Sequence, residues 1–189
     1  PPHSAGASYT LTFPNTDGNS SQFLQTDGSG NLTWADSNPG ITEFDQWRLT
    51  ASITGSQNPI SSNLERSDTP TAAYIGTGMT QSSGIFTFPS TGIWKIETVF
   101  LMYQSTSGAG NMYGHASVTT NNSSYADIIE AVKLELNGGI SAYGSMIFDV
   151  TNTTTHKVRF KTNFANNDQL QGNTDRNLTY FTFTRIGDT

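Results

Sequence analysis

The sequence lacks cysteine altogether and has few charged residues. The absence of cysteine excludes disulfide bonds, thiolate nucleophiles and Cys-ligated zinc. Charged residues make up 13% of the chain, about half of the ~25% usual for soluble domains. Fifteen Asp and Glu outnumber nine Lys and Arg, for a formal net charge of −6. This balance argues against a nucleic-acid surface and an anionic-membrane surface, because both need clustered basic residues.

Long hydrophobic runs are also missing. No apolar run approaches the ~20 residues of a membrane span, and no signal peptide is visible, so we expect no membrane insertion. The chain begins with Pro1-Pro2 rather than Met, and we expect further segments upstream. A length of 189 residues suits one domain of ordinary size with a shorter appendage.

The densest aromatic and β-branched stretch runs from Gly84 to Tyr103, in a chain whose polarity comes mainly from Ser, Thr, Asn and Gly. Strand alternation places Trp94, Ile96, Phe100 and Met102 on one face, and Ile93, Lys95, Glu97, Val99, Leu101 and Tyr103 on the other. The second half of this strand is apolar on both faces. A second sheet layer or another chain should therefore cover the second face.

Short strands are predicted at regular spacing after the turn at Asn38-Pro39-Gly40. Their expected ranges are Asp45–Ile53, Ala72–Ile75, Gly84–Phe88, Gly92–Tyr103, Met112–Thr119, Ala131–Leu136, Ser145–Val150, Lys157–Asn163 and Leu178–Arg185. The segment from Ser124 to Leu136 is ambiguous, because a capping pattern and an i, i+4 apolar line also allow a helical turn at Ala126–Glu130. Strands this short and frequent predict a β-sandwich or jelly roll.

The first forty residues contain a repeat with a spacing of ten residues. Phe13-Pro14-Asn15-Thr16-Asp17-Gly18 recurs as Phe23-Leu24-Gln25-Thr26-Asp27-Gly28, and Asp-Gly is a strong hairpin-turn dipeptide. Small β units are expected at Tyr9–Phe13, Gln22–Gln25 and Leu32–Trp34. Hairpins this small are marginal alone in water, so they indicate either a stalk of several wound copies or a flexible linker.

The pattern Gly84-x-Phe86-x-x-Pro89-x-x-Gly92-x-Trp94 resembles the signature of the globular heads shared by the first complement component and tumour necrosis factor. Further stretches resemble strands of the same heads: Val132 to Gly138, Ser145 to Phe160, and Leu178 to Phe183. The resemblance covers roughly residues 45–186. It implies an all-β jelly-roll sandwich, homotrimeric, with the final strand near the trimer axis.

We expect two domains: a β-rich trimeric stalk at residues 1–40, which the repeat and the turn at its end indicate, and a jelly-roll head at residues 41–189, which the resemblance implies. The expected trimer interface consists of Val99, Leu101, Tyr103, Phe181 and Phe183. Lys95 and Glu97 share the face directed to the axis, where a buried ionic ring could fix the register, although an exposed pair is an equal alternative.

The N-terminal segments resemble a connector of tail fibres of bacterial viruses, and with the head they imply a viral fibre tip. The expected function is structural and receptor-binding, and the expected location is the virion, outside the cell. The expected partners are two sister chains, upstream fibre segments and a host cell-surface glycan or protein receptor. The alternatives are a glycan depolymerase domain and a purely structural virion protein without a ligand.

Residues suited to catalysis or metal binding are scattered. Asp127, Glu130 and Glu135 are close in sequence, but on a strand Glu130 and Glu135 point to opposite faces. His3, His115 and His156 show no metal-ligand spacing. We therefore expect no enzymatic activity, no metal and no cofactor.

The polar segment from Asn163 to Asn177 is too long for a minimal connection, which fits a functional loop and, equally, a plain crossover packed over one end of the head. Amide and carboxylate side chains offer paired donors and acceptors to sugar hydroxyls. The predicted receptor contacts are Asn166, Asn167, Asp168, Gln169, Asp175 and Arg176, with Tyr113 from the neighbouring loop.

Overall fold

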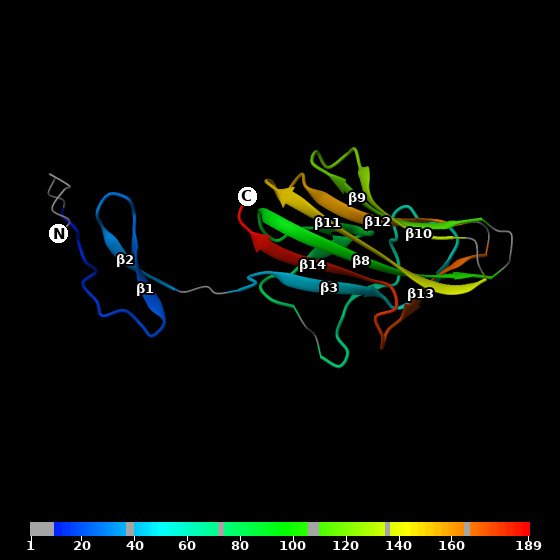
Figure 1. Cartoon of the computed structure of the whole chain (residues 1–189), viewed down its shortest axis with the longest axis horizontal. Coiled ribbons are helices and arrows are strands. Elements are labelled where there is room, and N and C mark those ends of the chain that lie inside the picture. Colours follow the sequence, from blue (N-terminus) through cyan, green and yellow to red (C-terminus); the bar gives the residue numbers. More distant parts are fainter. Residues whose placement is uncertain (1–9, 37–39, 72–73, 106–109, 135–136, 165–166) are drawn as a thin grey trace. The chain divides into compact units, whose positions relative to one another are not determined.

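The computed structural model describes residues 10–36, 40–71, 74–105, 110–134, 137–164 and 167–189, and this part of the chain is built from β-strands and their connections. Within it, no helix is long and apolar enough to cross a membrane. The chain divides into two compact units, Pro1–Gly40 and Ile41–Thr189. Figure 1 shows the strands of both units.

The N-terminal unit is a single hairpin with a flanking segment. Strands β1 (Gln22–Thr26) and β2 (Leu32–Asp36) pair antiparallel, and Thr12 forms a parallel bridge with Asn31. The Asp27 carboxylate closes the turn, and hydrogen bonds from the Asn31 side chain and the Ser29 amide lower the pKa of Asp27. Phe13 is 64% exposed and Phe23 51%. The other described residues of this unit thus do not bury these two aromatic rings.

The C-terminal unit, or head, is a sandwich of two antiparallel sheets. The strands of the five-stranded sheet, in spatial order, are β10 (Ala126–Lys133), β9 (Met112–Thr119), β12 (Lys157–Asn163), β7 (Ile85–Thr87) and β6 (Thr80–Ser82). The seven-stranded sheet has the order β4 (Ala51–Thr54), β13 (Gln169–Asn173), β8 (Gly92–Gln104), β14 (Tyr180–Gly187), β3 (Phe44–Leu49) and β5 (Leu64–Arg66), and β11 (Gly138–Val150) pairs with β8.

The core fills the space between the two sheets. Trp94, Ile96, Phe100 and Met102 of β8 are buried, as the alternation predicted. An aromatic stack joins the layers, because the ring of Phe160 in β12 lies parallel to that of Phe181 in β14, with centroids 3.6 Å apart. The arrangement is a jelly-roll sandwich, which confirms the predicted fold class of the head.

Most predicted strands are present, with informative differences. β9 and β12 have the predicted bounds, and β8 differs by one residue at its end. The range 45–53 contains two strands, β3 and β4, and β11 begins at Gly138 rather than Ser145. The helical turn considered at Ala126–Glu130 is wrong, because these residues belong to strand β10. Of the range Ala72–Ile75, the first two residues lie outside the described part, and Ile75 forms an isolated bridge with Phe44.

Gly114 lies where β9 passes over the ring of Phe100. A Cβ added at this position would lie 2.6 Å from the ring, which is closer than non-bonded carbons approach. Replacing Gly114 by Ala should therefore lower the free energy of unfolding by about 1–3 kcal/mol, as expected for an overpacked core. Urea unfolding measures the loss. Gly187→Ala is the control, since its Cβ would meet no atom within 4 Å, and an equal loss in both variants would contradict the prediction.

Candidate functional site

The polar segment predicted as one long loop, residues 163–177, contains strand β13. This strand pairs with β4 and β8, and its Leu170 is buried in the core. At ~3.3 Å per residue, β13 spans about 13 Å and separates Asn167 from Asp175. The structure therefore distributes the predicted receptor contacts over the two ends of β13 and, for Tyr113, a strand of the other sheet.

Asp168 is the clearest correction within this segment, because its side chain is only 1% exposed. Its Oδ1 accepts a hydrogen bond from the Ser105 amide, and its backbone carbonyl accepts one from the Gly55 amide. These bonds tie neighbouring connections together, so the prediction of Asp168 as a receptor contact is wrong. Asn167 is exposed and Gln169 is half-buried, whereas Asn166 lies outside the described residues.

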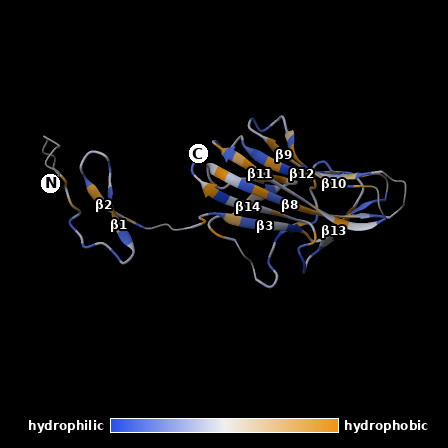
Figure 2. Cartoon of the chain, viewed as in Figure 1, coloured by the Kyte–Doolittle hydropathy of each residue, from blue (hydrophilic) through white to orange (hydrophobic). Residues whose placement is uncertain are grey.

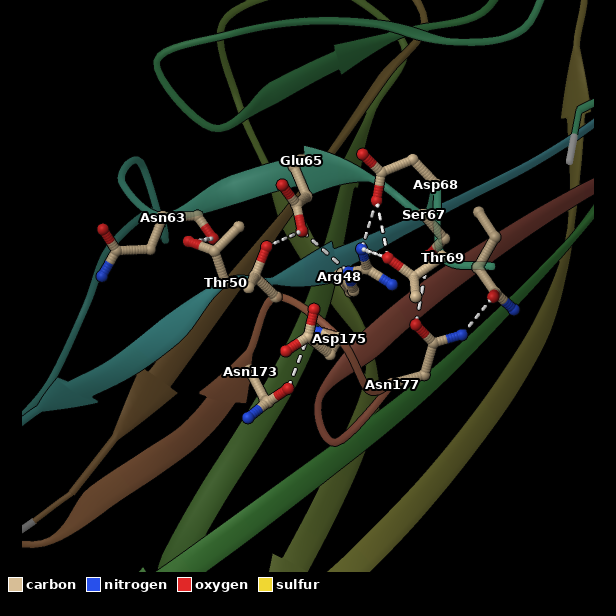
Figure 3. A network of polar contacts seen from close by, with 12 residues as sticks. Arg48, Thr50, Asn63, Glu65, Ser67, Asp68, Thr69, Asn173, Asp175 and Asn177 are labelled. Carbon is tan, nitrogen blue, oxygen red and sulfur yellow. Dashed lines mark hydrogen bonds and ion pairs between the residues drawn. The ribbon is translucent and has the colours of Figure 1, made fainter. Parts of the chain in front are cut away.

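Asp175 and Arg176 are exposed in the turn between β13 and β14. The side chain of Asn173 accepts a hydrogen bond from the Asp175 amide at 2.8 Å, which fixes the turn. Figure 3 shows this turn beside a network of polar contacts around Arg48. Among the predicted contacts, these two residues are the ones held on a defined, solvent-facing turn.

Arg48 is the buried centre of that network, with 1% of its side chain exposed. Its Nε donates to Glu65 at 2.8 Å, and a terminal nitrogen pairs with Asp68 and donates to Thr69 (Figure 3). Thr174 donates from its hydroxyl to the same Glu65 oxygen at 2.9 Å. The guanidinium group thus connects β3, β5 and the turn after β13, which is a structural role.

Tyr113 lies on the outer face of the five-stranded sheet, away from the turn that carries Asp175. Its register partners are Val132 in β10 and Asn163 in β12. The Asn111 amide nitrogen donates to the Tyr113 hydroxyl at 3.3 Å. The ring stacks with that of His115, with centroids 6.2 Å apart. Tyr113 and Asn163 therefore share a surface that the remaining predicted contacts do not.

A β-bulge brings two of the candidate carboxylates to the same outer face. The register between β10 and β9 shifts between Asp127 and Ile129, so Ile128 is the extra residue. Asp127 pairs with Ser117 and Glu130 with His115, although the two acids are three residues apart. Parity alone would have placed them on opposite faces. Glu135, the third acid considered, lies outside the described residues.

The two carboxylates are already engaged by neighbouring side chains. Lys161 lies 2.7 Å from Asp127, and the Ser117 hydroxyl donates to Asp127 at 2.6 Å. Glu130 lies 3.8 Å from Nδ1 of His115. Burial alone would raise the pKa of Asp127, but the hydrogen bonds from Lys161 and Ser117 lower it. The arrangement is an ion pair between Asp127 and Lys161, with Glu130 beside His115, on the outer face of the sheet.

Asp127→Asn should lower the free energy of unfolding by no more than about 1 kcal/mol at pH 7, the range of partly exposed pairs. Because the folded pKa is lowered, the stabilisation is full above the unfolded pKa of about 3.9 and is lost as the pH falls through the folded pKa. Urea unfolding at pH 7 and pH 2 measures both values. A difference between wild type and variant that persists at pH 2 would contradict this assignment.

The two histidines of the described residues lie apart from each other. His156 lies between the hydroxyls of Thr151 and Thr155, at 3.3 and 3.1 Å, and packs on Phe148. His115 lies 3.8 Å from Glu130 on the outer face of the five-stranded sheet, and His3 lies outside the described residues. Where the chain is described, no group of three or more His, Asp or Glu residues could hold a metal ion.

The outer face of the seven-stranded sheet carries exposed apolar side chains. Tyr143 and Ile147 of β11 are 60% and 58% exposed, and Tyr103 of β8 is 44% exposed. Val99 and Leu101 are half-buried, and they oppose Tyr143 and Ser141 in register. Figure 2 shows hydrophobic residues along β8, β11 and β14 of this sheet. These residues form an apolar strip that the head itself does not cover.

A polar group interrupts the strip. Lys95 lies 2.8 Å from Glu97, and the Tyr143 hydroxyl donates to Glu97 at 2.7 Å. The hydrogen bond from Lys95 is the main cause that lowers the pKa of Glu97. A cavity of about 260 Å³ beside this group is lined by Phe44, Tyr143 and Tyr180 among others. The pair is thus half-exposed in a single chain.

Phe181 and Phe183 are not part of this face. Both rings are fully buried, and both pack against Phe86 and Phe160 in the core between the sheets. The prediction of Phe181 and Phe183 at a trimer interface is therefore wrong. Among the side chains that β14 directs outward, Tyr180 and Thr182 line the cavity beside Glu97.

Comparisons with known proteins support the fold. No protein-family model matches the sequence, and no curated protein matches it. The crystal structure of murine APRIL at pH 8.5 has a TM-score of 0.57 at 13% identity, covering 76% of this chain and 98% of that chain. The structure of Eiger TNF from S. frugiperda has a TM-score of 0.62 at 8% identity, covering 79% and 96%. The head is a tumour necrosis factor-like jelly roll, as the resemblance predicted.

Proposed function

We propose that this chain forms the homotrimeric tip of a viral fibre, a structural and receptor-recognition protein without enzymatic activity. It would act outside the cell as part of the virion, joined to upstream fibre segments through residues 1–40. Its receptor would be a glycan or protein of the host cell surface.

The observation that carries this proposal is the apolar strip on the outer face of the seven-stranded sheet. Tyr143, Tyr103 and Ile147 are large side chains exposed on the same sheet face, which the Lys95–Glu97 pair interrupts, and exposed apolar patches mark interaction sites. A closed trimer would bury the same strip of every copy against its neighbours. The chemistry of the strip therefore favours further copies of this chain as its cover.

The N-terminal unit adds independent support. Its hairpin exposes Phe13, Phe23 and Leu11, and two-stranded hairpins are marginal alone in water. Three copies side by side could bury these rings, as a wound stalk would. The sequence resemblance to fibre connectors is what assigns the assembly to a virus.

Trimerisation would also serve recognition. Asn167, Asp175 and Arg176 remain solvent-facing candidates for receptor contacts, and three copies on one tip multiply weak contacts to a repetitive surface. A non-enzymatic role is supported by Asp127, whose carboxylate is occupied by Ser117 and Lys161.

Native mass spectrometry and binding of the labelled full chain to intact host cells test the proposal. We expect a trimer at micromolar concentration and saturable cell binding. The matched variant is Leu101→Asp, which should give a folded monomer that binds cells at least tenfold more weakly, because avidity is lost. A wild-type chain that stays a stable monomer at this concentration would overturn the trimer, and a trimer without cell binding would leave a purely structural role.

A further inference from the structure

The outer face of β12 carries a row of basic side chains. Lys157, Arg159 and Lys161 alternate with the buried Val158 and Phe160, so all three point to the same side of the sheet. Neighbouring members of the row are about 7 Å apart along the strand. The whole chain has nine Lys and Arg. Within the described residues, no other strand carries three of them on one face. The row is a local cationic surface on an acidic protein.

Lys161 and Lys157 differ in how their charge is compensated. Lys161 pairs with Asp127 at 2.7 Å. Lys157 is only 9% exposed, and its Nζ donates to the Thr87 hydroxyl at 3.1 Å and to the Thr153 carbonyl at 2.7 Å. No carboxylate of the described residues lies within 4.0 Å of it. Burial lowers the pKa of Lys157, because desolvation of the ammonium group is not offset by a negative charge.

Arg159 is uncompensated in the same way. Its guanidinium group lies 4.0 Å from the centroid of the Tyr125 ring, and it forms no ion pair with the described carboxylates. Its Nε is buried and has no hydrogen-bond partner there. A guanidinium group stacked on a ring keeps the N–H groups of its edge available for a planar anion.

Two adjacent basic groups without a counter-charge are costly, because hydrogen bonds such as those of Lys157 satisfy the N–H donors of a desolvated cation but do not neutralise its charge. The neighbouring side chains on this face, Ser117 and Thr119, are buried and uncharged, so they leave the positive charge in place. A bound anion would supply the missing partner. The geometry thus has the features of an anion site that is complete only with a ligand.

We propose that Lys157 and Arg159 bind the acid group of an acidic cell-surface glycan. The same face continues along β12 to Asn163 and the neighbouring Tyr113, an amide and an aromatic ring that suit sugar hydroxyls and the apolar side of a sugar ring. Two uncompensated cations suit single, spaced acid groups, whereas the dense phosphates of a nucleic acid need many basic contacts. The inference rests on the proposed recognition function and names its ligand class.

The test uses the full chain and three immobilised polymers: polygalacturonate, dextran sulfate and neutral dextran. The variant Lys157→Gln/Arg159→Gln removes the uncompensated charges. The matched control Asp127→Asn/Lys161→Gln removes a compensated pair on the same face and leaves the net charge unchanged. We expect wild type to bind at least one acidic polymer and not dextran. The first variant should bind at least tenfold more weakly, and the control should bind within twofold of wild type.

A polymer that binds wild type and is lost with the first variant identifies the acid group as carboxylate or sulfate. Binding to neither acidic polymer, or equal loss in both variants, would overturn the site. Urea unfolding supplies a second readout, since removing uncompensated cations should leave the unfolding midpoint unchanged or raised. A clearly lowered midpoint, or dissociation of the trimer, would assign these cations to structure and overturn the proposal. If the chain is a monomer and its binding still depends on Lys157 and Arg159, the proposed trimer is wrong and the proposed anion site stands.

Discussion

Replacing Asp45 by Ala is expected to lower the free energy of unfolding by about 3–5 kcal/mol, because the change removes a buried carboxylate that accepts four hydrogen bonds and pairs with the partly exposed Arg66. Asp45 is fully buried, and its carboxylate receives two hydrogen bonds from Arg66, at 2.9 and 3.0 Å. The Trp47 indole donates to it at 2.9 Å and the Met79 amide at 2.7 Å. With Ala at position 45, these donors lose their acceptor in the core.

The loss is large relative to a typical total stability of 5–15 kcal/mol, and it should lower Tm by on the order of 10 °C. Calorimetry and urea unfolding measure both quantities. Asp188→Ala is the matched control, since Asp188 also pairs with an arginine but is 92% exposed, and exposed pairs contribute at most about 1 kcal/mol. Similar losses in both variants would show that the Asp45 contacts do not stabilise the fold.

Replacing Leu101 by Asp is expected to separate the proposed trimer while the head stays folded. Leu101 is half-buried on the outer face in a single chain, so a carboxylate there remains hydrated in the monomer. In the trimer the same group would be buried without a partner, which costs several kcal/mol. A cost of about 4 kcal/mol weakens association roughly a thousandfold. Sedimentation equilibrium measures the association, and circular dichroism measures the fold.

Trp94→Ala is the counterpart on the inner face of the same strand. Trp94 is buried and packs on Phe88, with ring centroids 5.2 Å apart. Its loss should lower the free energy of unfolding by about 3–5 kcal/mol through a cavity. Leu101→Asp should therefore dissociate the trimer while the head stays folded, and Trp94→Ala should instead destabilise the fold of the head. A Leu101→Asp chain that unfolds, or one that remains a trimer, would contradict the assignment of the outer face.

Strong alternation predicted the central strands well, and non-local pairing explains β13, one of the strands that were not predicted. β13 reads Gln169 to Asn173 with Leu170 as its single large apolar residue, so the segment resembles a polar loop. It becomes a strand because β4 and β8 offer hydrogen-bonding partners on either side. Those partners are far away in the sequence, so the local sequence pattern of residues 169–173 cannot predict the pairing.

The errors at the candidate sites have two other causes. Phe181 and Phe183 alternate with Thr, a pattern that by itself directs the rings into the core, and the resemblance to trimeric heads was wrongly allowed to override it. The bulge at Ile128 leaves no clear sign in the sequence, yet it decides that Asp127 and Glu130 share a face. The spacing of Lys157, Arg159 and Lys161, by contrast, was visible as an alternating basic row and could have been recognised.

The connection between the two units has a mechanical consequence. The head begins at Ile41, and its first strand, β3, starts at Phe44. The register of β3 with β14 runs from Phe44 opposite Thr184 to Arg48 opposite Tyr180, and antiparallel hydrogen bonds lie perpendicular to the strands. A tensile force along β3 would load these bonds together in shear rather than one after another, so the strand through which the chain enters the head is suited to resist pulling.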